Sequence, residues 1–255
     1  MEDFYEIGTE DLKITQPFRM LVAGPSSCGK SELIRACVTD PHLIAPAEHS
    51  RYYYPAQTLT PSRMEYIDSI RRCGEAPLSR LECFEGLPDM AELNALEGTK
   101  LIIIDDMFYD FVNSSEMKDL IVVHSHHADI SVIITSQNYF SQGKYAKTMS
   151  RNMTDLILFD SKTDRLPFEI VSRHLFPGHS RFLPKVMDWL RLNVPATYDR
   201  YIYVDCHPNS QIPEDLRVRT NITAKTTATR RSGDGCGGGE MSLRRQLPLI
   251  VFSPR

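Results

Sequence analysis

The sequence predicts an α/β fold with a mostly parallel sheet that carries helices on both faces. Short apolar runs alternate along the chain with segments whose apolar residues recur at helical spacing, the pattern of strand–helix–strand units. The chain has 255 residues, of which 42% are hydrophobic, ample for one core and marginal for two. We therefore expect a single α/β domain with appendages.

The expected elements follow one another in a regular order. The strands are short apolar or aromatic runs, the most apolar being residues 101–104, and each expected helix carries apolar residues three and four positions apart. Strands are expected at residues 18–23, 51–54, 81–84, 101–104, 130–135, 156–159 and 201–205. Helices are expected at residues 31–38, 62–73, 88–96, 115–124, 144–151, 167–175 and 182–190.

The C-terminal segment departs from this pattern. From about Thr223, residues such as Thr, Lys, Arg and Gly replace the periodic apolar positions, which predicts a disordered, low-complexity tail. The run LPLIVF at 247–252 could form a strand, but no neighbouring element supports it. The tail's basic residues could contact nucleic acid or serve as a nuclear address, or belong to a solvated linker. They are Arg230, Arg231, Arg244 and Arg245.

The strongest chemical signal is GPSSCGKS at residues 24–31, which matches the phosphate-binding pattern GxxxxGK[ST] between an expected strand and an expected helix. Glycine at two positions lets successive amides point at phosphate oxygens, and the helix N-terminus adds positive charge. Lys30 would reach the β and γ phosphates, and the Ser31 hydroxyl would bind Mg²⁺. The residues expected to hold the nucleotide are Gly24, Pro25, Ser26, Ser27, Cys28, Gly29, Lys30 and Ser31.

Two carboxylates follow the most apolar strand, in the sequence LIIIDD. Asp105, at the strand's carboxyl end, is expected to hold Mg²⁺ together with Ser31. Asp106 is then placed to polarise the attacking water, although Glu, one methylene longer, is usual in this role. The alternative is a pair of acids that merely cap a turn.

The next expected strand ends in ISVIITSQN. A polar side chain there would project between the two preceding strand ends and could sense the γ-phosphate. Gln137 has the reach and the amide chemistry for this role. Ser136 and Asn138 are close competitors, and either could instead cap a helix.

Two other patterns suggest different chemistry. His124, His126 and His127 could suggest zinc, but their spacing does not converge on one ion, and the end of a helix explains them better. The sequence SKTD at 161–164 is similar to the guanine-reading [NT]KxD motif. However, its first position is Ser, and Phe108 stands where a GTPase needs glycine.

Composition indicates an intracellular protein. The six cysteines contain no CxxC pair and are expected to be reduced thiols. We find no apolar stretch of membrane-spanning length and no secretory or transit signal, so we expect a protein of the cytoplasm or nucleus, without a membrane partner. Because the net charge is -4, contact with a polyanion would have to be local.

Taken together and in order, these motifs resemble the additional-strand ATPases of the FtsK and HerA superfamily. The resemblance is sharpest to the DNA-packaging ATPases of Polinton (Maverick) elements, adintoviruses and related large DNA viruses, and spans residues 16–222. It leaves 1–15 as a lead-in and 223–255 as a tail. The phrases that carry it are QPFRMLVAGPSSCGKSELI, ECFEGLPD, LIIIDDMF, SHHADISVIITSQNYFSQGKYAKTMSRN and YIYVDCHPNSQIPEDLRVRTNI.

This resemblance implies a P-loop NTPase fold in which an extra strand lies between the loop strand and the LIIIDD strand. It also implies a homo-oligomeric ring that hydrolyses ATP between subunits and acts on double-stranded DNA, with capsid or portal proteins as further partners. The neighbouring subunit would supply a positive group for the transition state. Arg151 is the best positional candidate and Arg165 the second; the alternative for each is a surface salt bridge.

We therefore expect an ATP-hydrolysing, Mg²⁺-dependent motor that moves duplex DNA. Its catalytic residues would be Lys30, Asp106, Gln137 and, from a neighbour, Arg151. One alternative is a nucleotide kinase or GTPase that acts on a small molecule. Another is a domesticated protein whose loop binds ATP as a structural ligand without motor activity.

Overall fold

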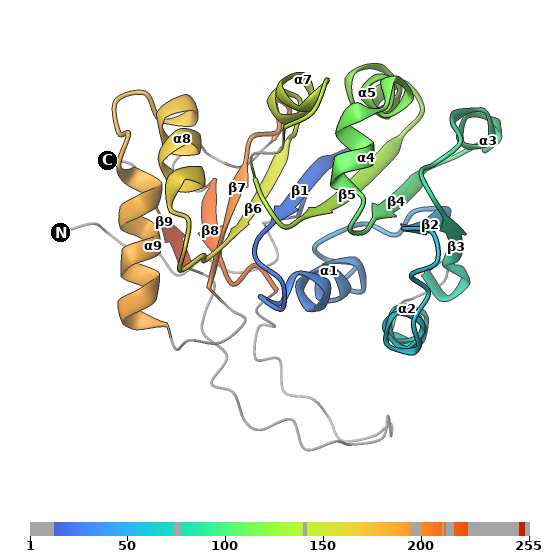
Figure 1. Cartoon of the computed structure of the whole chain (residues 1–255), viewed down its shortest axis with the longest axis horizontal. Coiled ribbons are helices and arrows are strands. Elements are labelled where there is room, and N and C mark those ends of the chain that lie inside the picture. Colours follow the sequence, from blue (N-terminus) through green and yellow to red (C-terminus); the bar gives the residue numbers. More distant parts are fainter. Residues whose placement is uncertain are drawn as a thin grey trace.

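The computed structural model describes residues 13–73, 78–139, 142–194, 200–210, 212, 217–223 and 250–252. These residues form a nine-stranded sheet in the order β3-β2-β4-β5-β1-β6-β7-β8-β9 (Figure 1). The first six strands in this order run parallel, and β7, β8 and β9 are antiparallel to their neighbours. The strands are β1 (Arg19–Ala23), β2 (His49–Tyr54), β3 (Glu82–Glu85), β4 (Lys100–Ile104), β5 (Ile130–Ser136), β6 (Asp155–Phe159), β7 (Tyr201–Asp205), β8 (Val218–Thr220) and β9 (Ile250–Phe252).

Helices cover both faces of this sheet (Figure 1). Helices α1 and α2 pack on one face, and α4, α5, α7, α8 and α9 pack on the other, each face having its own apolar cluster. The helices are α1 (Lys30–Val38), α2 (Pro61–Cys73), α3 (Met90–Ala95), α4 (Phe108–Asn113), α5 (Ser115–Asp119), α6 (Ser125–His127), α7 (Ala146–Arg151), α8 (Leu166–Leu175) and α9 (Phe182–Asn193). Among the described residues, no helix is long and apolar enough to cross a membrane.

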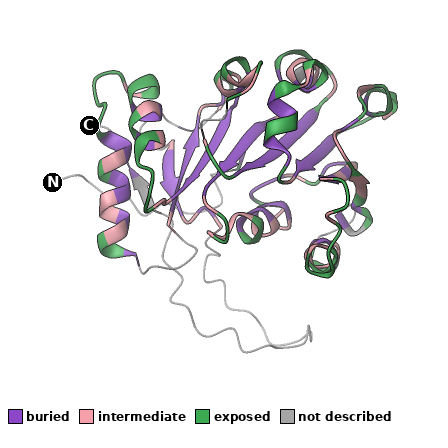
Figure 2. Ribbon diagram, in the orientation of Figure 1, coloured by how far each residue is buried: buried purple, intermediate pink, exposed green. Residues whose placement is uncertain are grey.

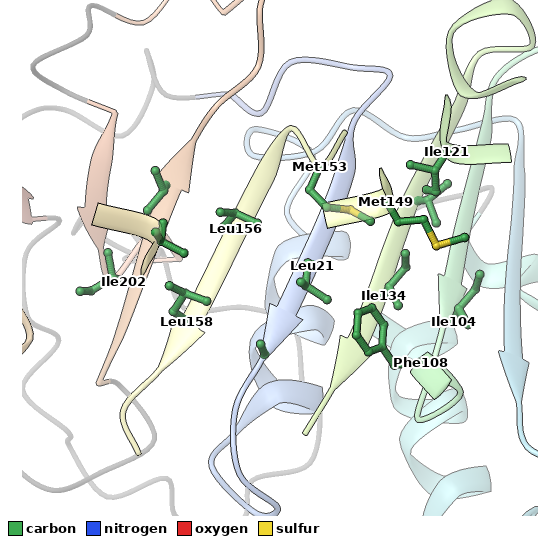
Figure 3. Packing of buried hydrophobic residues seen from close by; sticks show 14 of the residues in the cluster. Leu21, Ile104, Phe108, Ile121, Ile134, Met149, Met153, Leu156, Leu158 and Ile202 are labelled. Atoms are coloured by element: carbon green, nitrogen blue, oxygen red, sulfur yellow. The ribbon is translucent and has the colours of Figure 1, made fainter. Parts of the chain in front are cut away.

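The central strands are apolar on both sides because both of their faces are covered. In β1, Leu21 and Ala23 enter one cluster, whereas Met20 and Val22 enter the other, as expected of side chains that alternate along a strand. Figure 2 shows the central strands buried and the outer faces of the helices exposed. Figure 3 shows Leu21 in the cluster beneath α4 and α7, with residues of the neighbouring strands β5 and β6.

The strand order confirms the predicted α/β fold. Strand β5 lies between β1 and β4, so the additional strand expected from the resemblance separates the loop strand from the LIIIDD strand. The carboxyl ends of β1, β5 and β4 therefore meet at one edge of the sheet, with Ala23 beside Ser136 and Ile104 beside Ile134. This edge brings the three predicted motifs together.

Four features differ from the expected elements, the first being strand β8, which follows the strand at 201–205 that was expected to be the last. The helix expected at 115–124 continues through a π-helical segment, Leu120–His124, into α6 and ends at His127. Helix α4, which directly follows the two aspartates, was not expected. In the predicted tail, Ile250–Phe252 is ordered as β9 and pairs with β8, whereas residues 224–249 and 253–255 lie outside the described part of the chain.

Candidate functional site

The phosphate loop after β1 adopts a backbone conformation that depends on its two glycines, Gly24 and Gly29. Gly29 has a φ of 100° and precedes α1, a conformation that other residues rarely adopt. A Cβ at Gly24 would lie 2.5 Å from the Cβ of Phe159 and 2.8 Å from Sγ of Cys28, so a larger residue would displace the loop. The amide of Gly24 donates to the carbonyl of Ser136 at 3.1 Å, which fixes the start of the loop to β5.

Lys30 and Ser31 occupy the first turn of α1. The Lys30 ammonium donates to the carbonyls of Gly24 and Pro25 at 2.6 and 2.8 Å, so the lysine spans the loop. Ser31 is exposed at the same helix end. Burial raises the pKa of Cys28 against the opposing charge of Lys30, so this thiol is neutral at pH 7. Lys30 and Ser31 thus place a cation and a hydroxyl at the helix N-terminus.

Asp105 follows β4 and accepts hydrogen bonds on both carboxylate oxygens. Thr135 Oγ1 donates to its Oδ1 at 2.8 Å, and Tyr52 Oη donates to its Oδ2 at 2.5 Å. Arg63 Nη2 lies 3.4 Å from the same Oδ2. Burial and the Asp105 charge raise the pKa of Tyr52, so its hydroxyl stays protonated and can donate.

Asp106 has a left-handed backbone with a φ of 59°. Its amide donates to Thr135 Oγ1 at 2.7 Å, and its Oδ1 accepts from Gln137 Nε2 at 3.3 Å. Aspartate is several-fold enriched in this conformation among residues other than glycine, which gives a local reason for Asp where Glu is usual.

Gln137 makes different contacts from its two competitors at the end of β5, Ser136 and Asn138. Ser136 and Asn138 bond to each other: Ser136 Oγ donates to the Asn138 carbonyl at 2.5 Å and accepts from the Asn138 amide at 3.2 Å. Gln137 is exposed and contacts Asp106, thereby joining the ends of β5 and β4.

Three residues of this site were not predicted from the sequence: Tyr52, Arg63 and Thr135. Tyr52 begins a run of three tyrosines, and Arg63 lies near the start of α2, so neither stands in a recognisable motif. Thr135 sits inside ISVIITSQN and could have been found, because a hydroxyl at the end of the strand beside LIIIDD can reach the aspartates.

The residues present fit a magnesium ion held together with a nucleotide. Ser31 and Asp105 supply the hard oxygen atoms that Mg²⁺ prefers, and Mg²⁺ commonly uses one or two carboxylates plus phosphate oxygens and water. In the described part of the chain, no group of three or more His, Cys, Asp or Glu residues could hold a metal by itself. The donor set therefore suits a metal that arrives with phosphates.

The two arginine candidates lie in different surroundings. Arg151 is exposed at the end of α7, just before β6. Since β6 runs parallel to β1, this is the edge of the sheet opposite the loop, and Arg151 is not at its own subunit's site. Arg165 precedes α8 and pairs with Asp188 at 2.7 Å. Both side chains are exposed, so this is the surface salt bridge that the sequence left open as the alternative. A contribution by either residue to a neighbouring subunit stays a prediction.

The sequence SKTD forms a loop beside the phosphate loop. The amides of Thr163 and Asp164 donate to Ser161 Oγ, and Asp164 Oδ1 accepts at 2.9 Å from the amide of Leu166, the first residue of α8. Together with Gly24, Pro25 and Ser26 and the segment 137–139, this loop lines a pocket of about 270 Å³. Asp164 thus has a structural role in addition to facing this pocket.

Comparison with protein-family models finds no match, and comparison with the curated proteins finds none either. Among solved structures, the genome packaging NTPase B204 from Sulfolobus turreted icosahedral virus 2 in complex with ATP-gammaS aligns with a TM-score of 0.44 and 16% identity, covering 77% of this chain and 96% of that chain. The DNA-packaging ATPase B204 from Sulfolobus Turreted Icosahedral Virus aligns with a TM-score of 0.48 and 17% identity, covering 78% and 96%. EccC (ATPases 2 and 3) from Thermomonospora curvata aligns with a TM-score of 0.35 and 12% identity, covering 58% and 31%.

The fold assignment rests on the chain's own architecture: the phosphate loop between β1 and α1, the strand order and the two aspartates after β4. The chain has the fold of a P-loop NTPase of the additional-strand type.

Proposed function

We propose that this protein is an ATPase of the DNA-packaging type, which binds and hydrolyses ATP at the edge formed by β1, β5 and β4. The observation that carries the proposal is the hydrogen bond between Gln137 and Asp106, beside a phosphate loop and a second carboxylate at Asp105. A loop that bound ATP only as a structural ligand would not need an amide held against a second acid.

Each residue has a distinct part in this reaction. Lys30 and the loop amides bind the β and γ phosphates and offset their charge. Asp106 accepts a hydrogen bond from the attacking water and orients it, and Gln137 relates the state of the γ-phosphate to the position of β5. Ser31 and Asp105 would hold Mg²⁺, which would supply positive charge against the charge that develops on the phosphate oxygens.

We further propose that ATP hydrolysis drives movement of double-stranded DNA, which the sequence resemblance supports. Subunits would form a ring around double-stranded DNA, with Arg151 of one subunit completing the site of the next, a contribution worth on the order of a thousandfold in rate. Capsid or portal proteins would be partners of this ring. The exposed position of Arg151, away from its own site, is compatible with action on a neighbour.

The hydrolytic activity can be tested with purified protein in Mg²⁺. We expect ATP turnover by the wild type, a loss of at least about 100-fold in Lys30→Ala, and a loss of about 100-fold or more in Asp106→Asn. Asp110→Asn is the matched control, because it removes an exposed carboxylate from α4 just beyond the site. Nucleotide binding measured on the same samples shows whether the phosphate loop of Asp106→Asn still binds ATP.

The alternatives give different results. Turnover that requires GTP or a nucleoside acceptor would favour a GTPase or a nucleotide kinase. Equal rates in the wild type, Lys30→Ala and Asp106→Asn would mean that the loop has no hydrolytic function, as expected of a domesticated ATP-binding protein.

A further inference from the structure

Arg63 is a cation held inside the proposed ATP site by contacts on two sides. Its Nη2 lies 3.4 Å from Oδ2 of Asp105, and its Nη1 donates to the Thr58 carbonyl at 3.2 Å and also to the Thr58 hydroxyl. The two charged side chains are only 17% and 16% exposed. An ion pair so shielded is screened by solvent less than a surface pair.

The arginine contacts the carboxylate that the proposed metal would need. Oδ1 of Asp105 accepts from Thr135, and Oδ2 accepts from Tyr52 and faces Arg63. Tyr52 and Thr135 are neutral, and their bonds of 2.5 and 2.8 Å are shorter than the 3.4 Å contact with Arg63. A divalent cation at Asp105 would repel the guanidinium and could coexist with the two hydroxyls. Of these three partners, Arg63 is therefore the one that must yield.

Helix α2 keeps the displaced arginine near the site. Tyr66, one turn after Arg63, lies beside Tyr52 with ring centroids 6.0 Å apart. Burial and the charge of Asp105 raise the pKa of Tyr66, so the ring beside Tyr52 is neutral. The Thr58 contacts anchor one nitrogen of the guanidinium, and its other donors suit the oxygens of a phosphate group.

We propose that Arg63 is an exchangeable counter-ion: it neutralises Asp105 until a divalent metal displaces it, and its guanidinium then pairs with nucleotide phosphate oxygens. This proposal rests on the proposed ATPase function, because it assigns Asp105 to the metal. Arg63 would then be a cation from the same subunit, acting in addition to the arginine expected from the neighbouring subunit. Metal binding and nucleotide binding are thereby linked through one side chain.

The test uses Arg63→Gln and two measurements that do not depend on turnover. Binding of Mn²⁺ without nucleotide is followed by electron paramagnetic resonance, and Asp105→Asn identifies the signal from this site. Binding of ATP in the presence of Mg²⁺ is followed by calorimetry. Arg72→Gln is the matched control, since it removes the same charge from an exposed position on the same helix.

We expect opposite changes in Arg63→Gln. Mn²⁺ should bind about tenfold tighter, because the competing cation is gone, and ATP should bind about tenfold more weakly, because a phosphate partner is gone. Arg72→Gln should match the wild type in both measurements. A residue that only supported the fold would weaken both, so any result other than opposite changes overturns the proposal. Failure of the wild type to bind ATP would instead overturn the proposed function.

Discussion

The side-chain amide of Gln137 donates to the Asp106 carboxylate, with 3.3 Å between Nε2 and Oδ1. The bond links the ends of β5 and β4, strands that are adjacent in the sheet although the two residues lie 31 positions apart. Asp106 is the proposed water-orienting base and Gln137 the proposed sensor. A movement of either strand end would therefore change the hydrogen bond between these two residues.

This relationship predicts a selective kinetic defect in Gln137→Ala. We expect kcat to fall about 10-fold to 100-fold, whereas KM for ATP should change little, because the loop and Lys30 bind the phosphates. Steady-state kinetics measure both constants. Asn138→Ala is the control at the next exposed position, and a rise in KM with unchanged kcat for Gln137→Ala would show that Gln137 serves binding instead.

Thr135 supports both aspartates through a single hydroxyl. It donates to Asp105 and accepts from the Asp106 amide, and only 2% of the residue is exposed. Thr135→Val keeps the shape but leaves the Asp106 amide unpaired, so the free energy of unfolding should fall by about 1–3 kcal/mol. Urea denaturation measures the change. Thr135→Ser retains the hydroxyl and should lose much less; an equal loss in both variants would show that the hydroxyl contributes no more to stability than the methyl group.

Asp155 makes stability depend on pH. It is 1% exposed at the start of β6, and burial raises its pKa to about 7 despite hydrogen bonds from Tyr203 and Thr154. Between the unfolded pKa, near 4, and about 7, the folded state holds a proton that the unfolded state has released, so stability falls as pH rises through this range.

We expect the wild type to lose about 2 to 3 kcal/mol between pH 5 and pH 8 relative to Asp155→Asn, which cannot ionise. Urea denaturation at several pH values compares the two slopes and does not depend on their absolute stabilities. Parallel pH curves for the two proteins would mean that Asp155 has the same pKa in the folded and unfolded chains.

Strand β9 contributes to the core near the C-terminal end of the chain. Phe252 is 4% exposed and packs edge-on against Trp189, with ring centroids 5.6 Å apart. Phe252→Ala should lower the free energy of unfolding by about 3 kcal/mol, the usual cost of deleting a buried aromatic ring. Leu192→Ala, at a side chain 86% exposed on α9, is the control and should change stability little. Similar values for both variants would mean that β9 does not dock in solution.

The sequence predicted the parts of this fold that depend on local pattern. The apolar run of β4 and the glycine loop before α1 carry their own signals, and the resemblance supplied the place of β5 between β1 and β4. Strand β9 could not be assigned, because its partner β8 ends 30 residues earlier and pairing at that distance has no local signal. The π-helical segment Leu120–His124 was read as α-helix because both present apolar residues at similar spacing.

The same distinction applies to the site. Lys30, Asp105, Asp106 and Gln137 stand in motifs, and the structure places them at one edge of the sheet. Arg63 reaches Asp105 from a helix 42 positions earlier in the chain, a contact that only the packing of α2 creates.

We propose that ATP hydrolysis at this site is coupled to duplex DNA. The most direct measurement is the initial rate of ATP hydrolysis by the wild type with and without linear double-stranded DNA, on samples whose oligomeric state has been determined. We predict that DNA raises the rate severalfold and that Lys30→Ala abolishes both rates. Hydrolysis at the same rate with and without DNA would contradict the claim.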